Sequence, residues 1–312
     1  MSSIFQETFA SRLKDRVRDS RFIRVIRPTR ALFWRCQDYA LDQFAAICPR
    51  LSSKLLVVSI PKAGLHLLTE ALGGLREVSR RPLPLPNNLP VSSHRESFRG
   101  MARNRFAHWH YGATPETLAM AEETDASVIV VLRDPRDIVV SFVDYVCHLE
   151  AHVLHRYYQS LPDLRERMKQ AILGVPKDLF DRDSKIGQMR ANNPTYPGIS
   201  DIGEVCRSYL AWQKHLRTHF VYFEDLVGER GGGDGDRQFS EMRKLMEFLK
   251  LNYTDRRISR LCAGIYNPGS QTFNKGVQGR WKSAFTDETK DLFKMVAAKE
   301  LVRMGYEKDD QW

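Results

Sequence analysis

The chain has 312 residues, of which 42% are hydrophobic and 10% aromatic, so it can bury a sizeable core and is not globally disordered. Its formal net charge of +10 predicts attraction to anions such as nucleotides, sulfated substrates, nucleic acid or anionic lipid, without choosing among them. The five cysteines are scattered and form no C-x-x-C pair, which argues against a zinc site or a disulfide framework and favours a reducing, cytoplasmic location. No apolar run has the length of a signal peptide or a transmembrane helix.

Residues 1–50 are basic and amphipathic, with cations interleaved among Phe5, Phe9 and Leu13. This pattern predicts an N-terminal helical extension of one or two helices, broken near Pro28. Its apolar face needs a cover, and we expect it to pack on the domain that follows. A second copy of the chain, or peripheral contact with a membrane surface, stays open as the alternative cover.

Short apolar runs alternate with helical patterns over the rest of the chain. Residues 82–95 are expected to form a loop, and residues 150–200 pieces of helix that carry substrate-specific structure. The glycine-rich residues 231–235 are expected to be a linker. Alternating strands and helices predict one α/β domain with a central, mostly parallel sheet flanked by helices. Strands are predicted at 55–60, 105–111, 128–132 and 220–223, and helices at 63–75, 114–123, 135–149, 204–216, 239–250, 255–264 and 286–303.

The first predicted strand runs into the segment S-I-P-K-A-G-L-H at residues 59–66. Gly64 lets the backbone turn tightly, and the helix after it points free N–H groups at an anion. Lys62 adds a positive charge beside that helix end. The segment lacks the Gly-Lys-Ser/Thr of a Walker A loop, so phosphate binding and a plain strand-to-helix turn both stay open from this segment alone.

A second segment follows the apolar strand that ends at Leu132 and reads R-D-P-R-D-I-V-V-S-F. Arg133 stands at the strand end, where open parallel sheets bind their ligands. Asp134 suits the cap of the next helix, and Pro135 suits its first position. Ser141 follows eight residues after Arg133, so both side chains could reach one phosphate. Ordinary surface polarity is the alternative reading.

A third segment, N-K-G-V-Q-G-R-W-K at residues 274–282, combines two glycines with interspersed cations. The backbone of such a loop can wrap a phosphate, although glycine-cation loops are common and unspecific by themselves. No cluster of Asp, His and Cys suggests a metal, so we expect none.

Together these segments resemble the sulfotransferases that use 3′-phosphoadenosine 5′-phosphosulfate (PAPS). The order matches: a P-K-S-G-T-like loop, an R-x-P-x-D-x-x-x-S segment after a central strand, and a K-G-x-x-G-x-W-K-x-x-F-T loop near the end. Between them, Y-F-E-D-L at residues 222–226 resembles the family's Y-E-D-L strand end. The resemblance implies a P-loop-like nucleotide-binding core. With the amphipathic segment before it, the predicted organisation is an N-terminal helical extension at 1–50, a sulfotransferase domain at 51–305 and a tail at 306–312.

The resemblance also implies the reaction and the donor site. A sulfuryl group would pass from PAPS to a hydroxyl or amine of an acceptor, leaving 3′-phosphoadenosine 5′-phosphate (PAP). The first loop would hold the 5′-phosphosulfate, the second and third segments the 3′-phosphate, and residue 223 would contact adenine. The predicted donor-binding residues are Lys62, Ala63, Gly64, Leu65, His66, Leu67, Arg133, Ser141, Phe223, Asn274, Lys275 and Gly276.

The family's catalytic histidine lies on a strand before the second segment, and the best match here is His108 in H-W-H-Y. Residues two apart on a strand share a face, so His108 and His110 point the same way and either could accept a proton. We predict His108 as the general base. His110, and a purely structural pair, are the alternatives. Lys62 would stabilise charge on the departing phosphate.

Several positions depart from the family pattern, because Ala63, Leu65 and Leu67 stand where a serine, a threonine and an adenine-stacking tryptophan are usual. Asn274 likewise replaces an arginine. A catalytically impaired nucleotide-binding protein is therefore an alternative, whereas a P-loop phosphotransferase is disfavoured by the missing Gly-Lys-Ser/Thr. The acceptor is expected to be a small molecule or a glycan, and no nucleic-acid partner is expected. The sequence does not define the oligomeric state.

Overall fold

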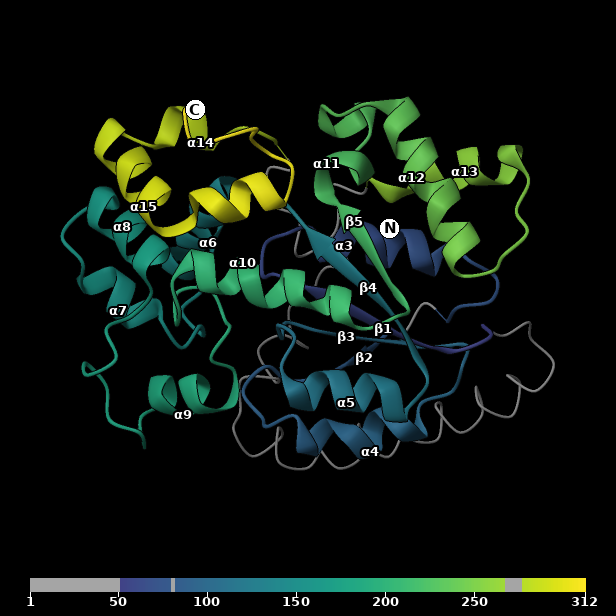
Figure 1. The fold of residues 1–312 in the computed structure, drawn as a ribbon, viewed down its shortest axis with the longest axis horizontal. Helices are drawn as coiled ribbons and strands as arrows, with labels where there is room; N and C mark the ends of the chain where they lie inside the picture. Colours follow the sequence, from purple (N-terminus) through teal and green to yellow (C-terminus); the bar gives the residue numbers. More distant parts are fainter. Residues whose placement is uncertain (1–50, 80–81, 267–276) are drawn as a thin grey trace, which may run out of the picture. The chain divides into compact units, whose positions relative to one another are not determined.

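A computed structural model of the protein describes residues 51–79, 82–266 and 277–312 (Figure 1). Residues Arg50–Trp312 form one compact unit. The predicted N-terminal helical extension lies outside the described residues. So do Asn274, Lys275 and Gly276 of the third segment.

In the described part of the chain, five parallel strands form the central sheet in the order β2-β3-β1-β4-β5. The inner strands β1 and β4 are almost wholly apolar and buried, as expected for a parallel sheet covered on both faces. After β1 the chain forms β2 and β3 on one side of β1, and it then crosses over to form β4 on the other side of β1. Strand order therefore reverses beside β1, where open α/β sheets bind ligands. The strands are β1 Lys54–Ser59, β2 Leu83–Pro84, β3 Phe106–Trp109, β4 Ala126–Leu132 and β5 Thr218–Tyr222.

Helices cover both faces of this sheet, which confirms the predicted α/β class. Figure 1 shows α4 (Ser92–Gly100) and α5 (Pro115–Glu123) on one side, and α3 (Leu65–Gly73), α12 (Gly235–Phe248) and α13 (Asp255–Ile265) on the other. No helix of the described residues is long and apolar enough to cross a membrane. The other helices are α6 Pro135–His148, α7 His155–Ser160, α8 Leu164–Leu173, α9 Lys185–Asn192, α10 Ile202–Leu210, α11 Phe223–Leu226, α14 Trp281–Ala284 and α15 Asp287–Arg303, with 3-10 turns η1 Ala211–Lys214 and η2 Glu229–Gly231.

Local capping chemistry explains where the helices beside the site begin. Helix α6 starts as predicted, because the Asp134 side chain accepts a hydrogen bond from the Arg136 N–H and Pro135 occupies the first position. Helix α5 is capped by Thr114, which accepts from the Thr117 N–H. Both helices therefore begin where the sequence predicts, directly after their capping residues.

The loop predicted at residues 82–95 is wrong in part, because β2 and the start of α4 lie there. Strand β2 has two residues and stands at the sheet edge, so it carries no run of alternating residues. Helix α4 buries only His94 and Phe98 of its nine residues, so its apolar periodicity is too weak to be seen. The helix predicted at 204–216 ends at Leu210 and continues as a 3-10 turn.

Candidate active site

The carboxyl ends of the parallel strands meet at one edge of the sheet. Beyond β1 lies the loop that contains Lys62, and beyond β3 lies His110. Arg133 follows β4, and Phe223 follows β5. Segments that are far apart in the sequence are therefore brought together where strand order reverses.

The loop after β1 has an unusual backbone. Gly64 has a φ of 93° and caps helix α3 without a side-chain hydrogen bond, and Lys62 has a φ of 74°. A lysine in the left-handed region costs on the order of 1 kcal/mol, and such strain concentrates at functional sites. The loop leads straight into the first turn of α3, whose backbone N–H groups favour an anion.

Side chains around this loop contribute little hydrogen bonding. Ala63 and Leu67 are buried in the core, and Leu65 is half-buried against it. Burial, with smaller effects from the Lys62 and Arg133 charges, lowers the pKa of His66 to about 4, so its ring is neutral at pH 7. The polar groups that this loop offers at its surface are therefore chiefly its backbone and Lys62.

The Lys62 ammonium lies 4.3 Å from the centroid of the Tyr145 ring. Burial lowers the pKa of Lys62, and the neighbouring Arg133 charge lowers it further. Two cations that disfavour each other in this way are stabilised when an anion binds between them.

Arg133 is the central contact of the site. Its guanidinium is buried, donates through Nη1 to the Lys62 carbonyl (3.1 Å) and through Nη2 to the Val277 carbonyl (2.9 Å), and lies 4.3 Å from the centroid of the Phe223 ring. Its carboxylate neighbour, Asp137, is 3.6 Å away. The Arg133 Nε is buried and has no hydrogen-bond partner within the described residues. One guanidinium thus links the first loop, the end of β5 and the start of the third segment.

One face of α6 holds the end of the third segment. The Asp137 carboxylate is buried and accepts hydrogen bonds from the Gly279 N–H (2.7 Å) and the Trp281 N–H (3.0 Å). Asp144 pairs with Arg280 at 2.6 Å. This ion pair holds the Arg280 side chain against α6. Neither carboxylate was assigned a role from sequence, although Asp137 belongs to the second segment.

Ser141 lies between these contacts. Positions 137, 141 and 145 share one face of α6, since residues four apart on a helix are neighbours. That face touches the third segment through Asp137 and the Lys62 side chain through Tyr145. The buried Ser141 is therefore placed on the side of α6 that faces both parts of the predicted donor site.

The two histidines differ in their surroundings. The His110 Nδ1 lies 2.7 Å from the Ser59 carbonyl, which can only accept, so Nδ1 carries the proton and the neutral ring keeps its lone pair on Nε2. Burial, partly offset by this hydrogen bond, lowers the pKa of His110 to about 4. His108 pairs in register with Val57, and burial lowers its pKa as well. The His108 Nδ1 has no hydrogen-bond partner in the described chain. Both rings are neutral at pH 7, but the contacts define the tautomer of His110.

Phe223 and Glu224 join the end of β5 to its neighbours. The Phe223 ring is buried and packs against Gly64 and Arg133. The Glu224 carboxylate accepts from the Asp134 N–H (3.1 Å) and the Tyr306 hydroxyl (2.8 Å). Burial raises the pKa of Glu224. The segment predicted as a tail at 306–312 therefore contacts the site through Tyr306.

Residues 52–305 match the family model described as "Sulfotransferase domain". The chain belongs to the sulfotransferase family.

This sulfotransferase has the fold of known members. A mouse sulfotransferase, SULT7A1, solved in complex with PAP, is similar over 83% of this chain and 87% of its own, with 13% identity and a TM-score of 0.55. Two structures of retinol dehydratase, one with androsterone and PAP (TM-score 0.45) and one with retinol and PAP (TM-score 0.41), are similar over 81% of this chain and 82% of their own at 15% identity. No curated protein matches the chain in sequence.

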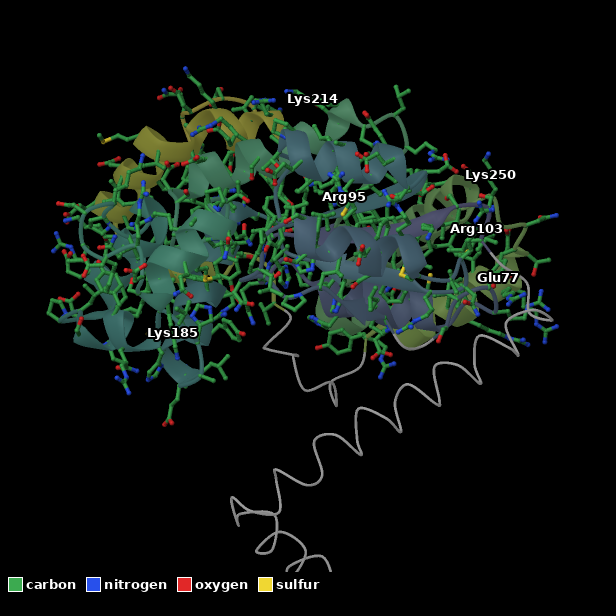
Figure 2. All side chains as sticks on the ribbon, turned by 90° about the horizontal axis from the view of Figure 1, so that it is seen from below. Glu77, Arg95, Arg103, Lys185, Lys214 and Lys250 are labelled. Atoms are coloured by element: carbon green, nitrogen blue, oxygen red, sulfur yellow. The ribbon has the colours of Figure 1, made fainter. Side chains whose placement is uncertain are left out.

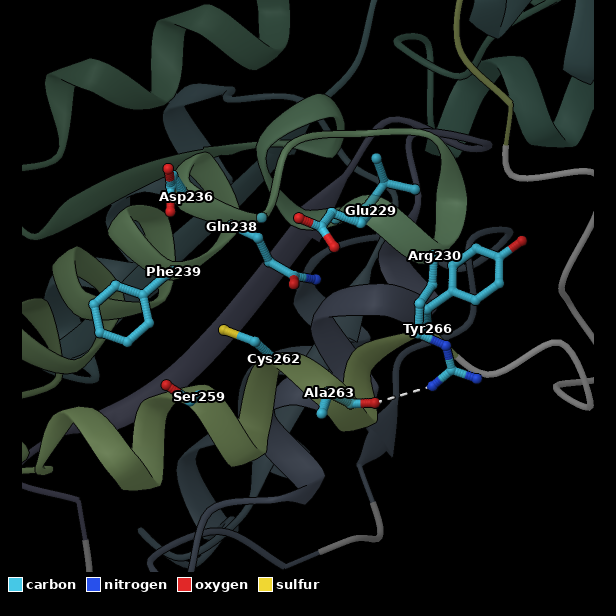
Figure 3. A pocket seen from close by; sticks show the side chains of 12 residues that line it. Glu229, Arg230, Asp236, Gln238, Phe239, Ser259, Cys262, Ala263 and Tyr266 are labelled. Atoms are coloured by element: carbon cyan, nitrogen blue, oxygen red, sulfur yellow. Dashed lines mark hydrogen bonds between the residues drawn. The ribbon is translucent and has the colours of Figure 1, made fainter.

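A separate pocket of about 380 Å³ lies between the α11–η2 turn, α12 and α13 (Figure 3). Arg230 at its rim donates to the Ala263 carbonyl (3.1 Å), and Tyr266 lines the same side. None of the predicted site residues lines this pocket. Among the residues described, no group of three or more His, Cys, Asp or Glu could hold a metal ion.

Proposed function

We propose that this sulfotransferase transfers a sulfuryl group from PAPS to a hydroxyl or amine of an acceptor and releases PAP. The observation that carries the proposal is the environment of Arg133. A buried guanidinium is expensive unless charges and hydrogen bonds compensate it. Here the nearest carboxylate of the described chain is 3.6 Å away, and Nε is unpartnered. A phosphate at this edge of the sheet would add a second negative charge beside the guanidinium and an acceptor for that N–H.

The residues present fit a donor with two anionic ends. Lys62 and the first turn of α3 would bind the 5′-phosphosulfate. Arg133 and Ser141, on the α6 side, would bind the 3′-phosphate. Phe223 is buried between Gly64 and Arg133, so it supports the two sites rather than offering an open stacking face for adenine.

The chemistry then needs a base and a charge on the leaving group. A neutral histidine accepts the acceptor proton while the acceptor oxygen bonds to sulfur. The sulfur–oxygen bond to the phosphate breaks, and Lys62 stabilises the negative charge on that phosphate oxygen. Such preorganised charges contribute about 3–4 kcal/mol each in a dry site. His108 is the base that the sequence predicts. His110 is the second candidate, because its Nε2 lone pair is fixed by the hydrogen bond to Ser59.

A donor-binding protein without transferase activity is the second candidate function. It is favoured by Ala63, Leu65 and Leu67, which pack into the core and supply no hydroxyl or stacking ring. Such a protein would bind PAP and leave acceptors unchanged.

A transfer assay separates the two. The protein is incubated with PAPS and a panel of phenols, alcohols, amines and glycans, and both PAP release and acceptor mass are followed. Lys62→Met should lower turnover by about 10²–10³-fold. Lys214→Met, at an exposed lysine (Figure 2) that precedes the amino end of β5, should leave turnover within about twofold of wild type. PAP binding without any sulfated acceptor supports the binding protein, and absence of PAP binding contradicts both functions.

A further inference from the structure

A cluster at the start of α6 connects the donor site to the last residues of the chain. It consists of Arg136, Trp281, Glu307 and Trp312 and is called the Arg136 cluster below. The Arg136 side chain is 3% exposed, and its guanidinium carbon lies 3.9 Å from the Trp281 ring centroid and 4.4 Å from that of Trp312. Its Nη1 lies 2.5 Å from a Glu307 carboxylate oxygen, and its Nη2 2.8 Å from Asp134.

This environment gives the guanidinium one well-defined position. Two carboxylates satisfy its N–H groups, and two indole rings lie within cation–π distance. Removing a ring would admit water and loosen the stack. Arg136 is bonded to Asp134, the cap of α6, and Arg133 directly precedes this cap. The positions of the two arginines are therefore linked through the start of α6.

The Arg136 cluster also reaches the third segment. Trp281 ends the stretch Val277–Trp281, which is held by Asp137 through two backbone N–H groups. The Val277 carbonyl accepts from Arg133. Stacking of Trp281 on Arg136 is thus a further attachment of this stretch, and like the Arg280–Asp144 ion pair it acts on a side chain rather than on the backbone.

Trp312 is itself held in place by α15. Its ring centroid lies 6.1 Å from that of Phe293 and 5.4 Å from that of Trp281, and the Lys294 ammonium is 5.1 Å from it. The C-terminal segment therefore bridges α15, the third segment and the start of α6.

From these contacts we propose that Trp312 and Glu307 are positioning residues for recognition of the donor's 3′-phosphate. Through Arg136 and Trp281 they hold Val277–Trp281 against α6, and this stretch in turn orients the Arg133 guanidinium. The inference rests on the proposed function. It assigns to the C-terminal segment a part in choosing a 3′-phosphorylated nucleotide over one that lacks this group.

The test compares two nucleotides on the full chain by calorimetry: PAP, and adenosine 5′-phosphate, which lacks the 3′-phosphate. Trp312→Ala should weaken PAP binding about tenfold, equivalent to about 1.4 kcal/mol, and leave adenosine 5′-phosphate within about twofold. Trp312→Phe keeps an aromatic face over Arg136 and should restore most of the preference. Met295→Ala, at an 84% exposed position on helix α15, against which Trp312 packs, is the control and should change neither affinity.

A merely structural role predicts a different result. If Trp312→Ala weakens both nucleotides equally, or neither, the proposal is wrong. Should Trp312→Ala fail to fold, Glu307→Gln is the second variant, because it removes the charge beside Arg136 and keeps the side-chain shape. Its preference for PAP over adenosine 5′-phosphate should fall about threefold. An unchanged preference in Glu307→Gln then overturns the proposal. A wild-type protein that binds both nucleotides equally contradicts the proposed function itself.

Discussion

The ring of Phe223 packs against Gly64 in the space that a Cβ at position 64 would occupy. Gly64 also has a φ of 93°, which only glycine adopts at little cost. The loop after β1 and the end of β5 can therefore approach each other only because residue 64 has no side chain. This contact brings the Arg133 guanidinium, which covers the Phe223 ring, next to the loop.

Gly64→Ala should lower the free energy of unfolding by about 2–3 kcal/mol, since it adds a steric overlap to backbone strain. It should also weaken PAP binding, because the loop must move to relieve the overlap. Denaturant unfolding and calorimetric titration measure the two effects. Gly100→Ala is the control: an added Cβ there meets no heavy atom within 4 Å, and stability should stay within about 0.5 kcal/mol. Equal stability of the two variants would refute the packing argument.

Arg133→Ala should weaken PAP binding by about 2–4 kcal/mol, as expected when a buried cation is removed from an anion. Arg133→Lys should recover only part of this, because one ammonium cannot reproduce the fork that bonds the Lys62 and Val277 carbonyls. Arg95→Ala removes a partly exposed ion pair with Glu123 and should leave PAP affinity unchanged.

Adenosine 5′-phosphosulfate, which lacks the 3′-phosphate, is the comparison ligand for the same calorimetric series. Wild type should prefer PAP, and Arg133→Ala should lose that preference. Equal wild-type affinity for the two nucleotides would show that Arg133 does not bind the 3′-phosphate.

His108→Ala should lower turnover by roughly 10²–10⁴-fold with PAP affinity nearly intact, because a general base acts on the acceptor and not on the donor. His110→Ala is the parallel variant, and single-turnover kinetics with saturating PAPS measures both. Should only His110→Ala show the loss, the prediction of His108 is wrong and the fixed Nε2 of His110 is the base. Loss in neither variant would mean that the base lies elsewhere.

The pH dependence of kcat/KM should reflect these buried rings. The base works only when neutral, and burial lowers the pKa of both histidines, that of His110 to about 4. The acid limb should therefore lie below about 6.5, the ordinary pKa of histidine, and near pH 4 if His110 is the base. Circular dichroism at each pH confirms that the protein stays folded. An acid limb centred near pH 6.5 would contradict a buried histidine base.

The sequence by itself determined the α/β class and the order of the main strands and helices. These features depend on residues that are close in sequence. An apolar run such as that of β4 predicts a strand buried on both faces, and the pair Asp134-Pro135 predicts the start of a helix. The weak elements β2 and α4 escaped detection because two residues, or two buried side chains, carry too little periodic signal.

Tertiary structure alone decided which distant side chains meet. Nothing in the local pattern shows that Asp137 binds the Gly279 backbone, that Tyr145 lies under Lys62, or that Arg136 stacks with Trp312. Such pairs form because packing of α6 between the first loop and the C-terminal segment brings their helices and loops within contact distance. Side-chain pairing of this kind depends on the relative placement of whole elements, whereas periodicity and capping depend only on neighbours along the chain.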